Sequence, residues 1–157
     1  MRHFSTAVGA VALMAAGLAT PASAATPKDT LVIAWNLDNL YTFDPAQIGE
    51  TTTDEIMNNV CDPLILTSYE KSSELIPGIA ESWAISEDGK QWTFKIRKGL
   101  KHSPSGNPLT AKDAEWSLRR VVQLNLNSAN IITKWGINKD NVEQAIQAKD
   151  NDTLVVT

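Results

Sequence analysis

Two alternating runs of residues joined by an Asp-Gly turn constrain the fold of this chain more than any other feature. In residues 82–86 and 91–97, apolar side chains alternate with small or polar ones, which is the two-residue period of a β-strand. Between the runs, Asp88-Gly89 is a strong signal for a short hairpin. One face of the predicted sheet carries five large apolar side chains: Trp83, Ile85, Trp92, Phe94 and Ile96. We therefore expect a small antiparallel sheet with one buried face.

A helix and a second hairpin follow. Thr110, with Asp113 three residues later, fits a capping box at the start of a helix that runs to about Leu124. Alternating apolar residues in 142–148 and 154–156 then predict two further strands around a polar turn. The sequence stops inside the last strand, which is an unusual place for a domain to finish, so we expect a truncated chain.

The preceding part of the chain mixes both kinds of element. Residues 30–35 are apolar and rich in β-formers, and we interpret them as a buried strand. Residues 36–45 favour turns and predict a long loop. Threonines 51–53 offer caps for a helix over 55–60, and a strand is predicted at 64–67. The fold class is therefore mixed α+β.

The first 24 residues are predicted to be a secretory signal peptide. Arg2 and His3 precede an apolar run over 7–19, and the small residues 22–24 form an A-x-A cleavage site. The run of 13 residues is shorter than the roughly 18–20 that span a bilayer, although a permanent N-terminal anchor is the alternative. Cleavage after Ala24 leaves 133 residues, and the residue directly after the site is Ala25, not a Cys that could accept a lipid.

The charge and the cysteine content limit the kinds of partner that this chain could have. After the predicted cleavage, 13 basic residues face 18 acidic ones, and without a basic cluster we expect no nucleic acid partner. Cys61 is the only cysteine, and its apolar neighbours favour a buried thiol over a pairing with a partner elsewhere.

No catalytic or metal motif is visible. The sequence has no Gly-rich phosphate loop, no G-x-S-x-G and no clustered metal-ligand spacing. After cleavage His102 is the only histidine; we interpret it as a solvated loop residue, with a ligand or base as the alternative. We expect no enzyme activity, no cofactor and no bound metal.

Residues 77–100 resemble the signature of the family 5 extracellular solute-binding proteins, the oligopeptide-, dipeptide- and nickel-type receptors of ABC importers. The resemblance continues through Phe43-Asp44-Pro45, 59–64 and the Thr-Ala-x-Asp helix start of 109–118. One segment, 102–107, departs from the family pattern, which usually has an aromatic residue and an Asp-Gly turn there.

The resemblance implies the N-terminal part of a type II periplasmic-binding-protein-like fold with the extra small domain of the peptide-binding class. On that pattern residues 1–24 are the signal peptide, 25–66 begin ligand-binding lobe I, and 67–157 form an incomplete extra domain, with lobe II absent. We would then expect the chain alone to bind its solute weakly or not at all.

The resemblance also implies a role and a set of contacts. The role is a periplasmic component that captures a peptide or similar small solute and delivers it to permease and ATPase subunits at the inner membrane. By position, the implied ligand-binding residues are Trp35, Asn36, Glu50, Thr51 and Thr52, with Trp135 as a weaker candidate. The alternatives are that Trp35 belongs to the core and that the threonines only cap a helix. We expect Trp83, Trp92 and Trp116 to pack internally.

Two other roles stay open at this point. One is a secreted hydrolase whose catalytic residues lie beyond Thr157. The other is a small exported interaction module.

Overall fold

The computed structural model describes residues 26–103 and 105–157, so the predicted signal peptide lies outside the described residues. The chain divides into two units, residues 1–34 and 35–157. In the first unit residues 26–34 have no helix or strand, and Leu31, Val32 and Ile33 are exposed. The predicted strand over 30–35 is therefore wrong. No described strand pairs with it, and an apolar run without a ladder or a facing layer has nothing to bury it.

The second unit begins with a loop and the helix α1 (Thr51–Val60). The chain leaves α1 in an extended conformation at Cys61, which is exposed. The prediction of a buried thiol is wrong, because Cys61 lies in a connecting segment that no described element covers. Strand β1 (Ile65–Thr67) pairs antiparallel with β2 (Leu75–Pro77), which confirms the strand predicted after Pro63.

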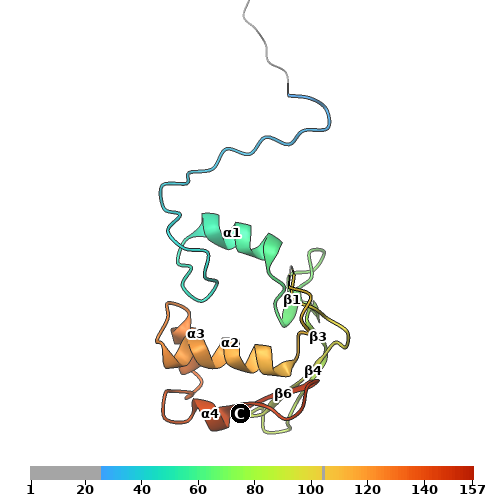
Figure 1. Cartoon of the computed structure of the whole chain (residues 1–157), viewed down its shortest axis with the longest axis vertical. Coiled ribbons are helices and arrows are strands. Elements are labelled where there is room, and N and C mark those ends of the chain that lie inside the picture. Colours follow the sequence, from blue (N-terminus) through green and yellow to red (C-terminus); the bar gives the residue numbers. More distant parts are fainter. Residues whose placement is uncertain (1–25, 104) are drawn as a thin grey trace, which may run out of the picture. The chain divides into compact units, whose positions relative to one another are not determined.

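Four antiparallel strands form the main sheet, in the order β3-β4-β6-β5 (Figure 1). They are β3 (Ala80–Ile85), β4 (Trp92–Ile96), β5 (Ile146–Ala148) and β6 (Thr153–Val156). The predicted hairpin is confirmed: Gly89 has φ 71°, and the Asp88 carboxylate accepts hydrogen bonds from the Lys90 amide and the Ser86 hydroxyl. The second predicted hairpin is confirmed in β5 and β6.

Three helices complete this part: α2 (Ala111–Gln123), α3 (Ala129–Thr133) and α4 (Val142–Ala145). Helix α2 contacts β5 and β6. Its capping box is present as predicted, since the Thr110 amide donates to the Asp113 carboxylate over 2.7 Å. Val142, predicted to be in a strand, lies in α4 instead; its carbonyl accepts a hydrogen bond from the Ile146 amide, so this residue starts a helical turn.

The core lies between the sheet and α2. Its buried residues are Ala80, Phe94, Ile96, Ala111, Val122, Ile137, Val142, Ala145, Ile146 and Leu154. Trp83 and Trp92 are half-buried beside this cluster, and the Trp92 and Phe94 rings stack with centroids 6.2 Å apart. Trp116 is 65% exposed, so its predicted packing is wrong. Helical periodicity did not reveal that this position points away from the sheet.

The mixed α+β fold class is confirmed. The domain boundary predicted between residues 66 and 67 falls inside β1 and stays a prediction. Across residues 26–103 and 105–157, no helix combines the length and apolar character needed to cross a membrane.

Candidate functional site

The start of α1 holds three of the six predicted ligand-binding residues. Glu50 is the N-cap, and its carboxylate accepts hydrogen bonds from the Thr53 amide, over 2.8 Å, and from the Thr53 hydroxyl. The sequence predicted that a threonine would cap this helix, so the identity of the cap is corrected to Glu50. An acidic cap suits this end, because the first amides of a helix carry partial positive charge.

These hydrogen bonds also affect the charge of Glu50. The hydrogen bond from the Thr53 hydroxyl, followed by that from the Thr53 amide, lowers the pKa of the Glu50 carboxyl. The group therefore stays ionised at neutral pH. Each carboxylate oxygen has two lone pairs, so the capping role leaves acceptor capacity for a further donor.

A long-range hydrogen bond brings the loop after Trp35 to the same place. The Thr52 hydroxyl donates to the Asn36 carbonyl over 3.2 Å. The side-chain oxygen of Asn36 accepts from the Asp38 amide over 2.8 Å, which fixes a local turn. Trp35, the residue directly before Asn36, is 43% exposed and therefore is not a core residue. We call the set Trp35, Asn36, Glu50, Thr51 and Thr52 the first-turn surface.

Trp135, the sixth candidate, lies elsewhere. It follows α3, and its amide donates to the Ile132 carbonyl over 3.1 Å. Its side chain is 83% exposed. No hydrogen bond among the described residues links it to the first-turn surface, so the structure does not bring all six candidates together.

The first-turn surface offers groups suited to a polar chain. Thr51 is exposed and Thr52 and Glu50 are half-buried, so hydroxyls and a carboxylate reach solvent. Hydroxyls both donate and accept, whereas an ionised carboxylate accepts from cationic groups. The exposed part of the Trp35 ring adds apolar contact area. This combination can bind a small polar solute by its main-chain groups.

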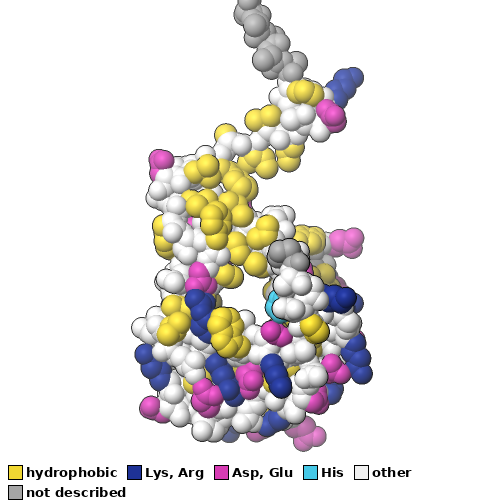
Figure 2. All heavy atoms as spheres, viewed as in Figure 1, with side chains coloured by type: hydrophobic (Ala, Val, Ile, Leu, Met, Phe, Trp, Pro, Cys, Tyr) yellow, Lys and Arg dark blue, Asp and Glu magenta, His cyan; other side chains and the backbone are white. Residues whose placement is uncertain are grey.

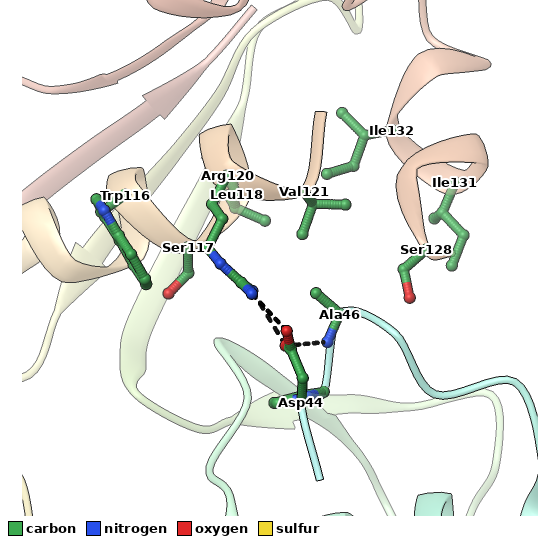
Figure 3. Close-up of a pocket in the computed structure, with 11 residues that line it drawn as sticks. Asp44, Ala46, Trp116, Ser117, Leu118, Arg120, Val121, Ser128, Ile131 and Ile132 are labelled. Carbon is green, nitrogen blue, oxygen red and sulfur yellow. Dashed lines mark hydrogen bonds and ion pairs between the residues drawn. The ribbon is translucent and has the colours of Figure 1, made fainter. Parts of the chain in front are cut away.

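A second feature was not predicted from the sequence: an ion pair between the loop and α2. Arg120 binds Asp44 through both guanidinium Nη atoms, with Nη1 3.0 Å from the carboxylate Oδ1 (Figure 3). The hydrogen bond from Arg120 lowers the pKa of Asp44 to about 2. The Arg120 guanidinium also lies over the Trp116 ring, 5.7 Å from its centroid. Sequence gave no signal for this pairing, because the partners are 76 positions apart.

The ion pair borders a hollow of about 620 Å³. Its wall is largely apolar, and Figure 2 shows hydrophobic side chains around it together with acidic and basic ones. The apolar and aromatic lining residues are Pro45, Ala46, Trp116, Leu118, Val121, Ile131 and Ile132. Arg120 is the one basic side chain among its lining residues, and it is already paired with Asp44.

The described residues contain no group of three or more His, Cys, Asp or Glu side chains that could hold a metal ion. His102 lies 3.3 Å from the Asp113 carboxylate and is partly exposed. That carboxylate also belongs to the α2 capping box, which gives it a structural role.

Comparison with known proteins adds a family match. The model of the bacterial extracellular solute-binding proteins, family 5, matches residues 74–157. The dipeptide-binding protein DppE of Bacillus subtilis is 30% identical over 145 residues, which cover 85% of this chain and 26% of DppE. The nickel-binding periplasmic protein of Escherichia coli is 34% identical over 102 residues, 62% of this chain and 18% of that protein.

Solved structures agree. OppA of Haemophilus influenzae, in complex with RPPGFSPFR, matches with a TM-score of 0.64 and 29% identity, over 73% of this chain and 24% of that chain. A periplasmic oligopeptide-binding protein of Borrelia burgdorferi matches with a TM-score of 0.63 and 26% identity. The match covers 74% of this chain and 25% of that chain. The chain spans about a quarter of DppE and of these two structures.

Proposed function

This chain belongs to the bacterial extracellular solute-binding proteins of family 5, and from that premise we propose that it serves as a periplasmic substrate-binding component of an ABC importer. The observation that carries the proposal is the family match over the sheet and α2. The predicted signal peptide, with cleavage after Ala24, supports export to the periplasm. Delivery of the solute to membrane permease and ATPase subunits is part of the same proposal.

We propose a small peptide or a similar solute as the ligand. Relatives carry names for dipeptides, oligopeptides and nickel, and the Haemophilus protein was solved with a nine-residue peptide. The ionised Glu50 suits the amino terminus of a peptide. The hydroxyls of Thr51 and Thr52 suit its main-chain amides and carbonyls, and the half-exposed Trp35 suits an apolar side chain.

Binding, and not catalysis, is the proposed activity. Among the described residues the one histidine faces Asp113, which is occupied in the capping box of α2. The relatives that match this chain are named for binding a solute, which supports this choice.

Backbone amide NMR tests the proposal, because it detects even millimolar complexes. A dissociation constant near 1 mM corresponds to only about −4 kcal/mol. The purified chain is titrated with a defined mixture of di- to pentapeptides, and the same mixture with acetylated amino termini is the control. We expect chemical shift changes concentrated at residues 35–36 and 50–52, and smaller changes with the acetylated peptides.

A matched variant sharpens the result. Thr51→Val removes an exposed hydroxyl that takes part in no hydrogen bond among the described residues, so it tests contact with the solute and not the helix cap. The absence of any peptide-induced change at the first-turn surface of the wild type would contradict the proposed site. Changes confined to the sheet would contradict it as well.

A further inference from the structure

We propose that Asp44 and Arg120 form a positioning pair that holds the first-turn surface in its binding arrangement without touching the solute. The inference rests on the proposed function in one respect, namely that this surface contacts the solute.

The loop that leads to α1 has few means of its own to keep its shape. Residues 35–49 contain no helix or strand. Their internal hydrogen bonds are local turns, such as the Ala46 amide to the Asp44 carboxylate over 3.1 Å and the Tyr41 hydroxyl to the Gln47 carbonyl over 3.1 Å. Local turns fix short stretches but do not fix where the loop lies against the rest of the unit.

Three contacts with distant residues supply that anchoring. The first is the paired Arg120 and Asp44, the second is the Asn127 side-chain amide donating to the Ile48 carbonyl over 2.9 Å, and the third is the Ser128 amide donating to the Ala46 carbonyl over 3.1 Å. All three join the loop to α2 or to the segment between α2 and α3. Figure 3 shows Asp44 pointing at Arg120 while the Ala46 amide turns back to the same carboxylate.

The ion pair is the strongest of the three by its chemistry. A two-pronged arginine–carboxylate contact is charge-assisted and directional. Both side chains are mostly shielded, with 27% and 22% of their surface exposed. The Trp116 ring under the guanidinium restrains Arg120 further. This gives the otherwise exposed Trp116 a place in the fold.

The three anchoring contacts, at Asp44, Ala46 and Ile48, lie close in sequence to the candidate ligand residues of α1. Only Gly49 separates Ile48 from Glu50, the cap of α1. Two residues after Glu50, the Thr52 hydroxyl donates a hydrogen bond to the Asn36 carbonyl, which closes the loop on itself. A loop released from α2 would therefore lose the arrangement of Asn36 and Thr52, and the apparent affinity would fall with the fraction of binding-competent molecules.

The test is regional hydrogen–deuterium exchange on the purified chain, with no solute present. Arg120→Met, Asp44→Asn and the double variant are compared with wild type. We expect amides of residues 42–53 to exchange about tenfold faster in each single variant, while amides of β4 and β6 stay unchanged. The double variant should be no faster than either single one, because both changes remove the same interaction.

Arg119→Met is the matched control. This neighbouring arginine is also half-buried but faces the other way, binding Glu115, Glu143 and the Ile146 carbonyl. Its loss should speed exchange near β5 and leave the loop unchanged. The proposal would be overturned if loop amides in Arg120→Met exchanged at the same rate as in the wild type. Equal acceleration across loop and sheet, or additive effects in the double variant, would overturn it as well.

The peptide titration separates this inference from the proposed function. In Arg120→Met, peptide-induced shifts at Asn36 and Thr52 should correspond to about tenfold weaker binding. If the wild type shows no peptide-induced shift, the first-turn surface fails as a solute contact of this chain, and the exchange data still decide whether the pair holds the loop. If the wild type binds and Arg120→Met binds equally well, the positioning role is overturned.

Discussion

The sheet region, residues 80–156, and the loop region, residues 35–61, are stabilised by different means. In the sheet region ten buried hydrophobic residues form one continuous cluster between the strands and α2. In the loop region only Ala46 and Thr53 are buried, and Leu37, Tyr41, Phe43 and Val60 are exposed. The sheet region therefore depends on apolar burial, and the loop region depends on a small number of polar contacts.

This difference bears on function. A region with a closed apolar core resists local opening, whereas a region held by a few hydrogen bonds opens at lower free energy. Five of the six predicted ligand residues lie in the loop region, namely Trp35, Asn36 and Glu50 to Thr52, whereas Trp135 lies in the sheet region. A binding protein benefits from mobile contact loops on a rigid base, provided that something defines their closed position.

Removing a core side chain from the sheet should have the largest effect. Leu154 on β6 is completely buried in the cluster. We expect Leu154→Ala to lower the free energy of unfolding by about 3–5 kcal/mol, because it leaves a cavity in a packed core. The matched control is Leu124→Ala, at a position 60% exposed, with an expected loss below about 1 kcal/mol. Denaturant midpoints measure both, and similar losses would contradict the conclusion that the sheet region depends on apolar burial in this cluster.

A second prediction probes the junction between the two regions. The amides of Ile79 and Ala80 donate to the carbonyls of Pro63 and Leu64, and a Cβ at Gly78 would overlap the Pro63 carbonyl oxygen. Gly78→Ala should therefore cost about 1–3 kcal/mol through overpacking against rigid backbone.

Gly49→Ala is the control for this change. Its added Cβ would meet the tip of a side chain, 2.7 Å from the Asn127 Nδ2 atom, and that side chain can rotate away. We expect a smaller loss of unfolding free energy than for Gly78→Ala. A larger loss at Gly49 would mean that the contact between the loop and Asn127 matters more than the junction.

Much of the sheet region could be predicted from the sequence, because its signals are local. Alternation in residues 82–97 and the Thr110–Asp113 capping box each depend on a few consecutive positions. The strand predicted at 30–35 failed because apolar character alone does not supply a pairing partner. The predicted internal packing of Trp116 was wrong for a related reason. Helical spacing alone does not tell which side of a helix faces the sheet.

The candidate site could be predicted only in part. Trp35, Asn36, Glu50, Thr51 and Thr52 were selected by resemblance, and the hydrogen bond from Thr52 to Asn36 joins the two segments that carry them. Their contact with a solute stays a prediction. The pairing of Asp44 with Arg120 could not be read from one sequence, because no pattern links two charges so far apart in the chain.

A smaller effect is expected from removing the cap of α2. The Thr110 hydroxyl accepts a hydrogen bond from the Lys112 amide over 3.3 Å. Thr110→Ala should lower the free energy of unfolding by about 1 kcal/mol, since one amide at the helix start loses its partner. Thr110→Ser keeps the hydroxyl and should stay close to wild type in thermal melting. Equal losses in both variants would show that the methyl group, and not the cap, is what matters.

The last effect, expected to be no larger than that of Thr110→Ala, is a pH dependence that comes from the loop region. The hydrogen bond from Arg120 lowers the pKa of Asp44 from 3.8 to about 2, so the folded state favours the ionised carboxylate. This stabilisation is present in full above the ordinary pKa and is lost as pH falls through the folded value. Because the pair is partly exposed, we expect Asp44→Asn to be less stable than wild type by about 1 kcal/mol at pH 6. Urea unfolding should show this gap closing between about pH 4 and pH 2.

Other carboxylates titrate in the same range, but they are common to both proteins and cancel in the difference. Asp140→Asn, which removes an exposed carboxylate from a turn, controls for the loss of one charge. A gap that stayed constant down to pH 2 would mean that the loop region does not draw stability from the charge on Asp44.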